Sequence, residues 1–305
     1  MSTKQTCPER KPLSAISQNK SHQTHSHQMK VIETISEMRS MRRQLATPVG
    51  FVPTMGYLHE GHLALIQRAR AENASLVVSI FVNPAQFDPQ EDFSSYPRNP
   101  QRDLAMLAAE QNDVVFMPSV MEIYPSGFNS WVEVGQVTNR LEGASRPGHF
   151  RGVTTVVAKL FDIVQPTRAY FGQKDAQQTI VVKKMVADLA MDLEIVTVPT
   201  VREPDGLAVS SRNAYLNLEE RPAATVLYRA LCLARQLWLQ GEKDAGNIRR
   251  QMTALIQKES RATTDYVSMA DPETLEEFDT VKPPALASLA VQIGKTRLID
   301  NVVLE

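Results

Sequence analysis

Between residues 49 and 198, short apolar runs alternate with longer segments in which apolar side chains recur at helical spacing. The short runs predict strands at residues 49–54, 76–82, 114–117, 168–171 and 193–198. The longer segments predict helices at residues 61–73, 101–112, 151–164 and 173–190. Apolar strands that alternate with helices are typical of a parallel sheet covered on both faces. We therefore expect an α/β domain whose ligands bind at the carboxyl ends of its strands.

The pattern changes near residue 200, where two helical segments are followed by strand-like segments with no further strand–helix alternation. The helices are expected at residues 219–240 and 245–259, and the strands at 265–270 and 288–305. A turn at Gly294-Lys295 interrupts the last of these segments. The chain is thus predicted to have a parallel-sheet domain at residues 29–201 and a smaller α+β domain at 202–305.

Residues 1–28 differ in composition from the rest of the chain. They are rich in Ser, Thr, Gln, Lys and His, carry four basic residues and one acid, and show no apolar period. This predicts a disordered N-terminal extension. It has no apolar segment of a secretory signal, and it lacks the Arg-rich amphipathic pattern of a mitochondrial one. The cluster His22, His25 and His27 could bind a metal adventitiously, but a solvated tail is the simpler interpretation.

Composition and charge exclude several classes of protein. The 305 residues are 43% hydrophobic and carry a net charge of −1, which predicts neither nucleic-acid nor membrane-surface binding. The longest apolar stretches are too short to span a bilayer. The two cysteines, Cys7 and Cys232, are too few for a disulfide framework, which favours a reducing cytosol.

The segment 53–62, PTMGYLHEGH, runs from a predicted strand into a predicted helix. His59 and His62 are three residues apart, so a helical turn would place them on one face, at the positive end of the helix dipole. Phosphate is the natural ligand at such a position. A zinc pair and two merely structural histidines are the alternatives. The spacing is not the H-E-x-x-H of helical zinc sites and no third ligand is evident, so phosphate binding is the preferred interpretation.

Two further segments could bind a small acid. FVNPAQF, at 81–87, places the amides of Asn83 and Gln86 at a strand end, although Asn-Pro also simply signals a turn. RPGHFRG, at 146–152, groups Arg146 and His149 before a buried helix. These residues suit anion binding, with a solvated basic loop as the alternative.

Two more segments suit phosphate and ribose. YFGQKDAQQ, at 170–178, follows a strand with Lys174 and Asp175, which suit a phosphate and ribose hydroxyls; surface charge is the alternative. SSRN, at 210–213, presents adjacent hydroxyls beside Arg212, and could otherwise be a helix cap. Gly294-Lys295-Thr296 matches the last three positions of the phosphate-binding loop pattern G-x-x-x-x-G-K-[ST]. Leu289 stands where the first glycine of that pattern is needed, so a hairpin turn is the preferred interpretation.

Taken together, the five segments resemble the pantothenate synthetase (pantoate–β-alanine ligase) family in order and spacing, over residues 29–305. His59-Glu-Gly-His62 also resembles the H-x-G-H signature of the wider nucleotidyltransferase superfamily. The resemblance implies a Rossmann-like first domain and a mobile C-terminal cover. It also implies ATP-dependent condensation of pantoate with β-alanine through pantoyl adenylate, releasing AMP and pyrophosphate. A cytoplasmic homodimer that uses ATP with Mg²⁺, and binds neither nucleic acid nor membrane, is expected.

The family's residue roles carry over onto matching positions. The resemblance implies phosphate-contacting, catalytic roles for His59, His62, Lys174, Ser210, Ser211 and Arg212. It implies further ATP contacts for Met55, Gly172, Asp175, Val201 and Val209. It implies a pantoate site made by Asn83, Gln86, Arg146 and Gln178. No direct metal ligand is expected; Asp103 is a candidate for a water-mediated contact with Mg²⁺, or else only an acid of the first helical turn.

Two positions depart from the family pattern. Val209 replaces the usual methionine before Ser210, and Gln173 replaces the usual glutamate before Lys174. Two other functions remain open: transfer of a nucleotide to a phosphorylated acceptor, and non-catalytic nucleotide binding. The amides of Asn83, Gln86 and Gln178 argue against the first of these, and the intact histidines and Lys174 argue against the second.

Overall fold

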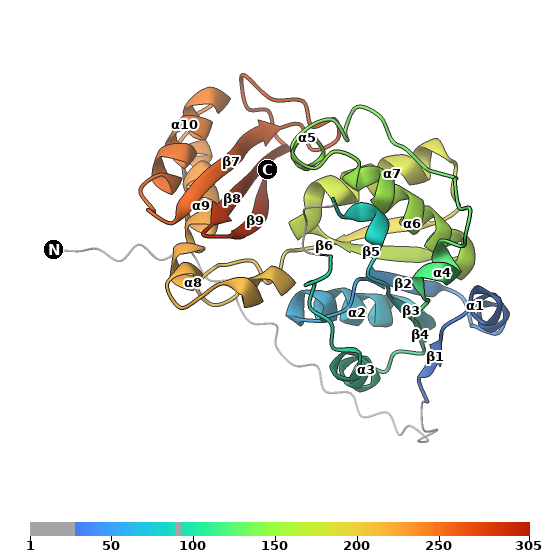
Figure 1. Ribbon diagram of the computed structural model, residues 1–305. Helices are drawn as coiled ribbons and strands as arrows, with labels where there is room; N and C mark the ends of the chain where they lie inside the picture. Colours follow the sequence, from blue (N-terminus) through green and yellow to red (C-terminus); the bar gives the residue numbers. More distant parts are fainter. Residues whose placement is uncertain (1–27, 89–92) are drawn as a thin grey trace, which may run out of the picture.

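The computed structural model describes residues 28–88 and 93–305. Within these residues the chain forms two sheets, each with its own helices and its own apolar core (Figure 1). The α/β domain with a smaller α+β domain is therefore confirmed. The prediction for the N-terminal extension at residues 1–28 lies, apart from Gln28, outside the described residues.

Within the described residues, the larger sheet has six strands, all paired in parallel, in the order β1-β4-β3-β2-β5-β6. Its strands are β1 (Lys30–Ile32), β2 (Val49–Thr54), β3 (Ser75–Ile80), β4 (Val114–Phe116), β5 (Arg168–Gly172) and β6 (Glu194–Val198). Every residue of β3 is buried, as expected for a central strand with helices on both faces. The Rossmann-like arrangement is confirmed.

Helices cover both faces of this sheet (Figure 1). On one face, α1 (Ile35–Arg42), α6 (His149–Val164) and α7 (Ala176–Asp188) enclose one apolar cluster. On the other face, α2 (Glu60–Glu72) and α3 (Pro100–Ala109) enclose a second cluster. Helix α6 is buried along most of its length because it lies directly against the middle of the sheet.

The connection order creates a crevice between β2 and β5. From β2 the chain proceeds through β3 to β4 on one side, and β5 and β6 lie on the other side. The segments that leave the carboxyl ends of β2 and β5 therefore diverge. In open parallel sheets such a reversal is where ligands bind.

The C-terminal domain is an antiparallel sheet of β7 (Ala262–Ala270), β8 (Ala285–Ile293) and β9 (Thr296–Leu304). Helices α9 (Val226–Leu239) and α10 (Ala245–Ile256) pack on it around an apolar cluster. The chain crosses into this domain after β6, through a short 3-10 segment, η3 (Ser211–Tyr215). The exact boundary at 201/202 stays a prediction.

Several element bounds differ from the sequence prediction. The helix predicted at 219–240 is divided into α8 (Glu220–Ala223) and α9. Between them, the backbone N–H groups of Thr225 and Leu227 donate to carbonyl oxygens three residues earlier in the chain. These bonds interrupt the α-helical ladder between Ala223 and Val226. The helix predicted at 173–190 begins as a 3-10 turn, η2 (Gln173–Asp175). Strands β7 and β8 begin earlier than predicted, at Ala262 and Ala285.

Several short elements were not predicted. They are β1, the helices α4 (Val120–Ile123) and α5 (Glu142–Ser145), and the 3-10 turn η1 (Pro84–Gln86). Helix α1 was also missed.

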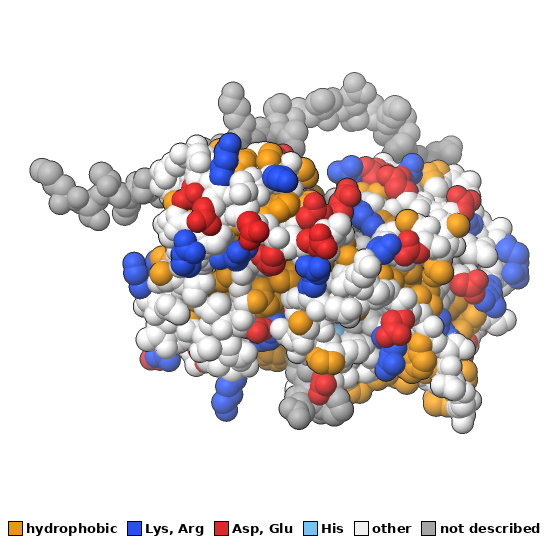
Figure 2. Space-filling view, turned by 90° about the horizontal axis from the view of Figure 1, so that it is seen from above, with side chains coloured by type: hydrophobic (Ala, Val, Ile, Leu, Met, Phe, Trp, Pro, Cys, Tyr) orange, Lys and Arg blue, Asp and Glu red, His pale blue; other side chains and the backbone are white. Residues whose placement is uncertain are grey.

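Charged residues of both signs are interspersed on the face seen in Figure 2. In the described part of the chain, no helix is both long and apolar enough to cross a membrane.

We predict that Gly152→Ala destabilises the fold. A Cβ at Gly152, on α6, would lie 2.1 Å from the carbonyl oxygen of Ala85. Because this neighbour is backbone, α6 and the 83–87 loop must move apart, at a cost of about 1–3 kcal/mol. Urea unfolding measures the change. Gly135→Ala is the control, since a Cβ there meets nothing within 4 Å and its cost should stay below about 0.5 kcal/mol. Equal losses in the two variants would contradict the close approach.

Candidate functional site

A cavity of about 240 Å³ opens at the carboxyl end of the sheet, between β2 and β5. Its walls come from the segments after β2, β3, β5 and β6, from α6, and from the chain before η3. It is lined by all the predicted nucleotide- and pantoate-binding residues: Met55, His59, His62, Asn83, Gln86, Arg146, Gly172, Lys174, Asp175, Gln178, Val201, Val209, Ser210, Ser211 and Arg212. Residues from both domains therefore meet in one space.

His59 and His62 begin α2 and are held by backbone hydrogen bonds. His59 is the N-cap residue: its Nδ1 accepts from the N–H of Gly61 at 3.2 Å. His62 Nδ1 accepts from the N–H of His59 at 3.3 Å, which completes a capping box. The two rings stack with centroids 4.0 Å apart. Since both Nδ1 atoms accept, each neutral ring carries its proton on Nε2 and keeps one N–H donor.

Both histidines are neutral at pH 7. Burial, together with the nearby positive charge of Lys174, lowers the pKa of His59 to about 4. Burial also lowers the pKa of His62 to about 3, with contributions from His59 and Lys174. The pair can therefore donate hydrogen bonds to an anion from Nε2 without first being protonated.

Asp103 lies in the first turn of α3, as the second of its two interpretations has it. It is 1% exposed, and its two carboxylate oxygens accept from the N–H groups of Tyr57 and Leu58, both at 2.8 Å. It lies behind the 53–62 loop, outside the set of residues that lines the cavity. The predicted water-mediated contact with Mg²⁺ is therefore not supported, because the carboxylate is used to hold the loop from α3.

Asn83 is committed to contacts within the protein. Its Oδ1 accepts from the N–H of Ala85 and from the hydroxyl of Tyr124, and its Nδ2 donates to Gln86 Oε1 at 3.0 Å. A fourth bond joins Nδ2 to the carbonyl of Gly152. Asn83 is 1% exposed, so it orients Gln86 more than it offers itself to a ligand. Sequence reasoning missed Tyr124, since a lone tyrosine in a short helix carries no motif.

The 146–152 segment closes the same corner of the cavity. His149 Nδ1 lies 2.8 Å from the carbonyl oxygen of Gln86, and its Nε2 lies 3.1 Å from Arg146 Nη1. If Nδ1 donates to the carbonyl, Nε2 accepts from the guanidinium. His149 lines the cavity but was not among the predicted ligands. Its place in a predicted motif was the available signal.

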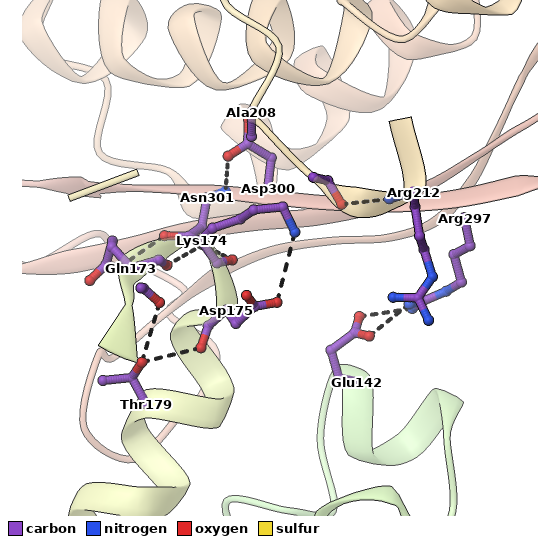
Figure 3. A network of polar contacts seen from close by, with 12 residues as sticks. Glu142, Gln173, Lys174, Asp175, Thr179, Ala208, Arg212, Arg297, Asp300 and Asn301 are labelled. Carbon is purple, nitrogen blue, oxygen red and sulfur yellow. Dashed lines mark hydrogen bonds and ion pairs between the residues drawn. The ribbon is translucent and has the colours of Figure 1, made fainter. Parts of the chain in front are cut away.

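Lys174 and the SSRN segment line one side of the cavity, which is called the phosphate side below because its cationic and hydroxyl groups suit phosphate oxygens. The Lys174 ammonium lies 3.8 Å from Asp175 Oδ1, and its side chain is 19% exposed (Figure 3). From the C-terminal domain, Ser210 caps η3 by accepting from the N–H of Arg212 at 3.3 Å. The backbone N–H of Val209 donates to the carbonyl of Val201 at 3.0 Å, so the two predicted ATP contacts are joined.

The donors of the cavity suit a magnesium ion that arrives with a nucleotide. Among residues 28–88 and 93–305, no three His, Cys, Asp or Glu side chains are grouped to hold a metal. Asp175 is the one acidic residue that lines the cavity in these ranges. Mg²⁺ commonly binds through phosphates, waters and one or two carboxylates. Such a donor set fits the ion without a dedicated protein cage.

The arrangement combines two kinds of chemistry. One side offers imidazole N–H, ammonium and guanidinium groups, which suit phosphate oxygens. The other side offers the amides of Gln86 and Gln178 beside apolar residues of α6 such as Val153 and Val157. This second surface suits a small molecule with both hydroxyl and methyl groups.

Comparisons with known proteins agree with this geometry. A sequence profile described as pantoate-beta-alanine ligase matches residues 30–303. The pantothenate synthetase of Herpetosiphon aurantiacus is 61% identical over 277 residues, covering 90% of this chain and 100% of that protein. That of Acetivibrio thermocellus is 55% identical over 280 residues, covering 91% and 100%.

Solved structures show the same similarity. The crystal structure of pantothenate synthetase from Thermus thermophilus has a TM-score of 0.87 and 49% identity, covering 90% of this chain and 99% of that one. A pantoate-beta-alanine ligase from Francisella tularensis, complexed with beta-gamma ATP and beta-alanine, has a TM-score of 0.75 and 36% identity. It covers 90% of this chain and 98% of its own.

We predict that the free energy of unfolding falls as the pH is lowered from about 6.5 towards 4. In this window the unfolded histidines, with ordinary pKa values near 6.5, bind protons that folded His59 and His62 do not. Stability therefore rises with pH, by up to about 1.4 kcal/mol per pH unit for each histidine.

Urea unfolding at pH 7, 6 and 5 measures this slope. In His62→Asn, the side-chain oxygen can still accept from the N–H of His59, but the residue no longer titrates. The variant should have the flatter profile, and parallel profiles would contradict a depressed pKa for His62.

Proposed function

We propose, from the premise that the chain belongs to the pantoate-beta-alanine ligase family, that the cavity joins pantoate to β-alanine through pantoyl adenylate. Ligation of the two acids with ATP is the family's activity. The observation that carries the proposal is that phosphate-binding donors and paired amides lie in one cavity at the reversal of the sheet.

The chemistry explains why ATP is required. A carboxylate is a poor acyl donor, because its leaving group would be oxide. In the first step a pantoate carboxylate oxygen attacks the α-phosphorus of ATP in line, and the bond to pyrophosphate breaks. In the second step the amine of β-alanine attacks the acyl carbon of pantoyl adenylate and expels AMP. Neither step requires a nucleophile from the protein, so catalysis rests on positioning and charge stabilisation.

The phosphate side of the cavity is where charge develops. We assign the Nε2–H groups of His59 and His62 to phosphate oxygens, at the positive end of α2. Neutral imidazoles donate hydrogen bonds without acting as acids, which suits a reaction whose first step transfers no proton. Lys174 and Arg212 neutralise the leaving pyrophosphate, with Ser210 and Ser211 as additional donors.

Adenosine is assigned to the crevice between the two domains. Asp175 accepts from ribose hydroxyls, and Gly172 allows the ribose to approach the backbone, since a Cβ there would meet nothing within 4 Å. Val201 and Val209 offer backbone groups to the adenine. Valine in place of methionine at 209 alters the side-chain packing, but the backbone bond between these two residues does not require a methionine.

Pantoate is assigned to Gln86 and Gln178, with Arg146 at the rim and Met55 between the pantoate and the α-phosphate. Gln86 Oε1 already accepts from Asn83, and its Nε2 lies 3.2 Å from Met55 Sδ. One N–H of this amide donates to Met55, and we assign the second N–H to a substrate oxygen. Asn83 contributes by fixing this orientation.

Mg²⁺ is assigned to the triphosphate, where it supplies charge neutralisation when bound, with Asp175 as the nearest lining carboxylate. A homodimer and a cytosolic location remain predictions from the family resemblance. Sedimentation of the purified chain tests the first of these.

We predict that the purified protein releases AMP, and not ADP, when given pantoate, β-alanine and ATP with magnesium. Chromatography of the nucleotides measures this directly. Pantoate alone should support exchange of labelled pyrophosphate into ATP, because the adenylate forms before the amine reacts. Formation of ADP, or absence of pantoate-dependent exchange, would contradict the adenylate.

We predict that Lys174→Ala lowers kcat by at least about 100-fold, or about 2.7 kcal/mol of barrier, because a contact to the departing pyrophosphate is lost. Lys184→Ala, on α7, is the control: Lys184 pairs with Asp188 on the surface and should have a near-normal rate. A Lys174→Ala variant as active as the control would exclude Lys174 from the mechanism.

A further inference from the structure

Strand β9 of the C-terminal domain contacts the backbone beside Lys174. Asn301 Nδ2 donates to the carbonyl oxygens of Gln173 and Lys174, both at 2.9 Å. In return, Gln173 Nε2 donates to Asn301 Oδ1 at 2.9 Å. Figure 3 shows the three side chains together, with Asn301 reaching from β9 to η2. The Asn301 amide is thus bonded at both ends to the segment that carries the catalytic lysine.

The preceding residue contacts the other phosphate-binding segment. The Asp300 carboxylate binds both terminal nitrogens of Arg202, at 2.5 and 2.9 Å. Arg202 also donates to the carbonyl of Gly206, and it forms an isolated β-bridge with Ala208. Arg202 therefore holds the loop that leads into Ser210, Ser211 and Arg212. One dipeptide of β9 is thus bonded directly to the segment of Lys174 and, through Arg202, to the loop that leads into the SSRN segment.

Burial of Asp300 and Asn301 favours a single arrangement of their hydrogen bonds. Asn301 is 4% exposed and Asp300 is 2% exposed. Buried polar groups that lose their partners cost about 1–3 kcal/mol each, so a shifted arrangement is disfavoured. The donor at position 173 adds direction: because Gln173 donates to Oδ1, the Nδ2 of Asn301 must face the two carbonyls. Gln173, which departs from the family pattern, thus selects one orientation of the Asn301 amide.

A second contact joins the domains elsewhere. Arg297 binds the carboxylate of Glu142, on α5, at 2.6 and 2.8 Å, and the hydroxyl of Tyr266 donates to the same carboxylate at 2.9 Å. This cluster attaches the C-terminal domain to α5, whereas Asn301 attaches it to η2. A variant at Glu142 can therefore loosen the attachment of the two domains without removing the hydrogen bonds beside Lys174.

We propose that Asn301 is a positioning residue for Lys174, and that Asp300, through Arg202, holds the SSRN segment in register with it. A single strand, β9, then positions both phosphate-binding segments, although these belong to different domains. The inference rests on the proposed role of Lys174 in the reaction. Displacing a reacting contact by about 1 Å can cost about 100-fold in rate, so a support of this kind affects turnover.

The test compares Asn301→Ala with the wild-type protein. The substitution removes all three hydrogen bonds and brings no new charge near Lys174. We expect kcat to fall by about 10- to 100-fold. The KM for pantoate should change less than the kcat, because Gln86 is held by its own contacts with Asn83 and Met55. Asn301→Leu, of similar volume, should give the same result, and it serves as the test if the alanine variant does not fold.

Two controls separate positioning from general loosening. Glu142→Gln weakens the other interdomain contact; it should lower the free energy of unfolding but change kcat less than threefold. Gln173→Ala leaves both carbonyl bonds of Asn301 in place and should cost less than either Asn301 variant. Equal losses of kcat in Glu142→Gln and Asn301→Ala would overturn the proposal, as would a normal kcat in Asn301→Ala.

Calorimetry with a non-hydrolysable ATP analogue distinguishes failure of this inference from failure of the proposed function. We expect its Kd to rise at least threefold in Asn301→Ala and to be unchanged in Glu142→Gln. If Lys174→Ala is impaired but both Asn301 variants turn over and bind normally, only the inference fails. If the wild-type protein releases no AMP, the proposed function fails, and the Kd comparison still decides whether Asn301 supports the nucleotide site.

Discussion

The parallel pairing of β2 with both β3 and β5 is the constraint on which the rest of the structure depends. It directs the segments after β2 and after β5 away from each other, so that the space between them is left for a ligand. The 53–62 loop and the 172–178 segment are brought to this space by the sheet, although more than a hundred residues separate them in the chain. Helix α6 then closes the floor with apolar side chains.

Polar groups behind the cavity determine which atoms face it. The carboxylate of Asp103 holds the loop of the histidines, and the backbone takes up both Nδ1 atoms, so the N–H donors that remain are on Nε2. In the same way, Tyr124 and the N–H of Ala85 fix Asn83, which in turn fixes Gln86. Burial keeps both histidines neutral. The chain has a net charge of −1, so its cavity offers an anion fixed N–H donors and a few cationic side chains, and no overall positive charge.

Much of the fold could be predicted because it is local. The strand Val49–Thr54 was predicted with its observed bounds, and the long amphipathic helices were found to within a few residues. The misses have local causes too. Strand β1 lies at the edge of the sheet with only Ile32 buried, so no apolar run marks it. The division of the predicted helix at 219–240 depends on turn geometry at Ala224 and Thr225. Most of the candidate ligands that line the cavity could be named from the sequence because they stand in motifs. The sequence left two interpretations open for Asp103, since an acid at a helix start looks the same whether it faces a ligand or a loop, and the structure shows it bonded to the loop.

The sequence by itself determined the alternation of strands and helices, the five motifs, and therefore the family and its substrates. These are properties of residue type and spacing, which need no knowledge of distant contacts. Only the tertiary structure decided which nitrogen of each histidine is free, that Asn83 faces inward to Gln86, and that Asp300 and Asn301 join segments from both domains. These outcomes depend on partners far away in the chain, and a buried hydrogen bond is specified by the position of both its groups in space.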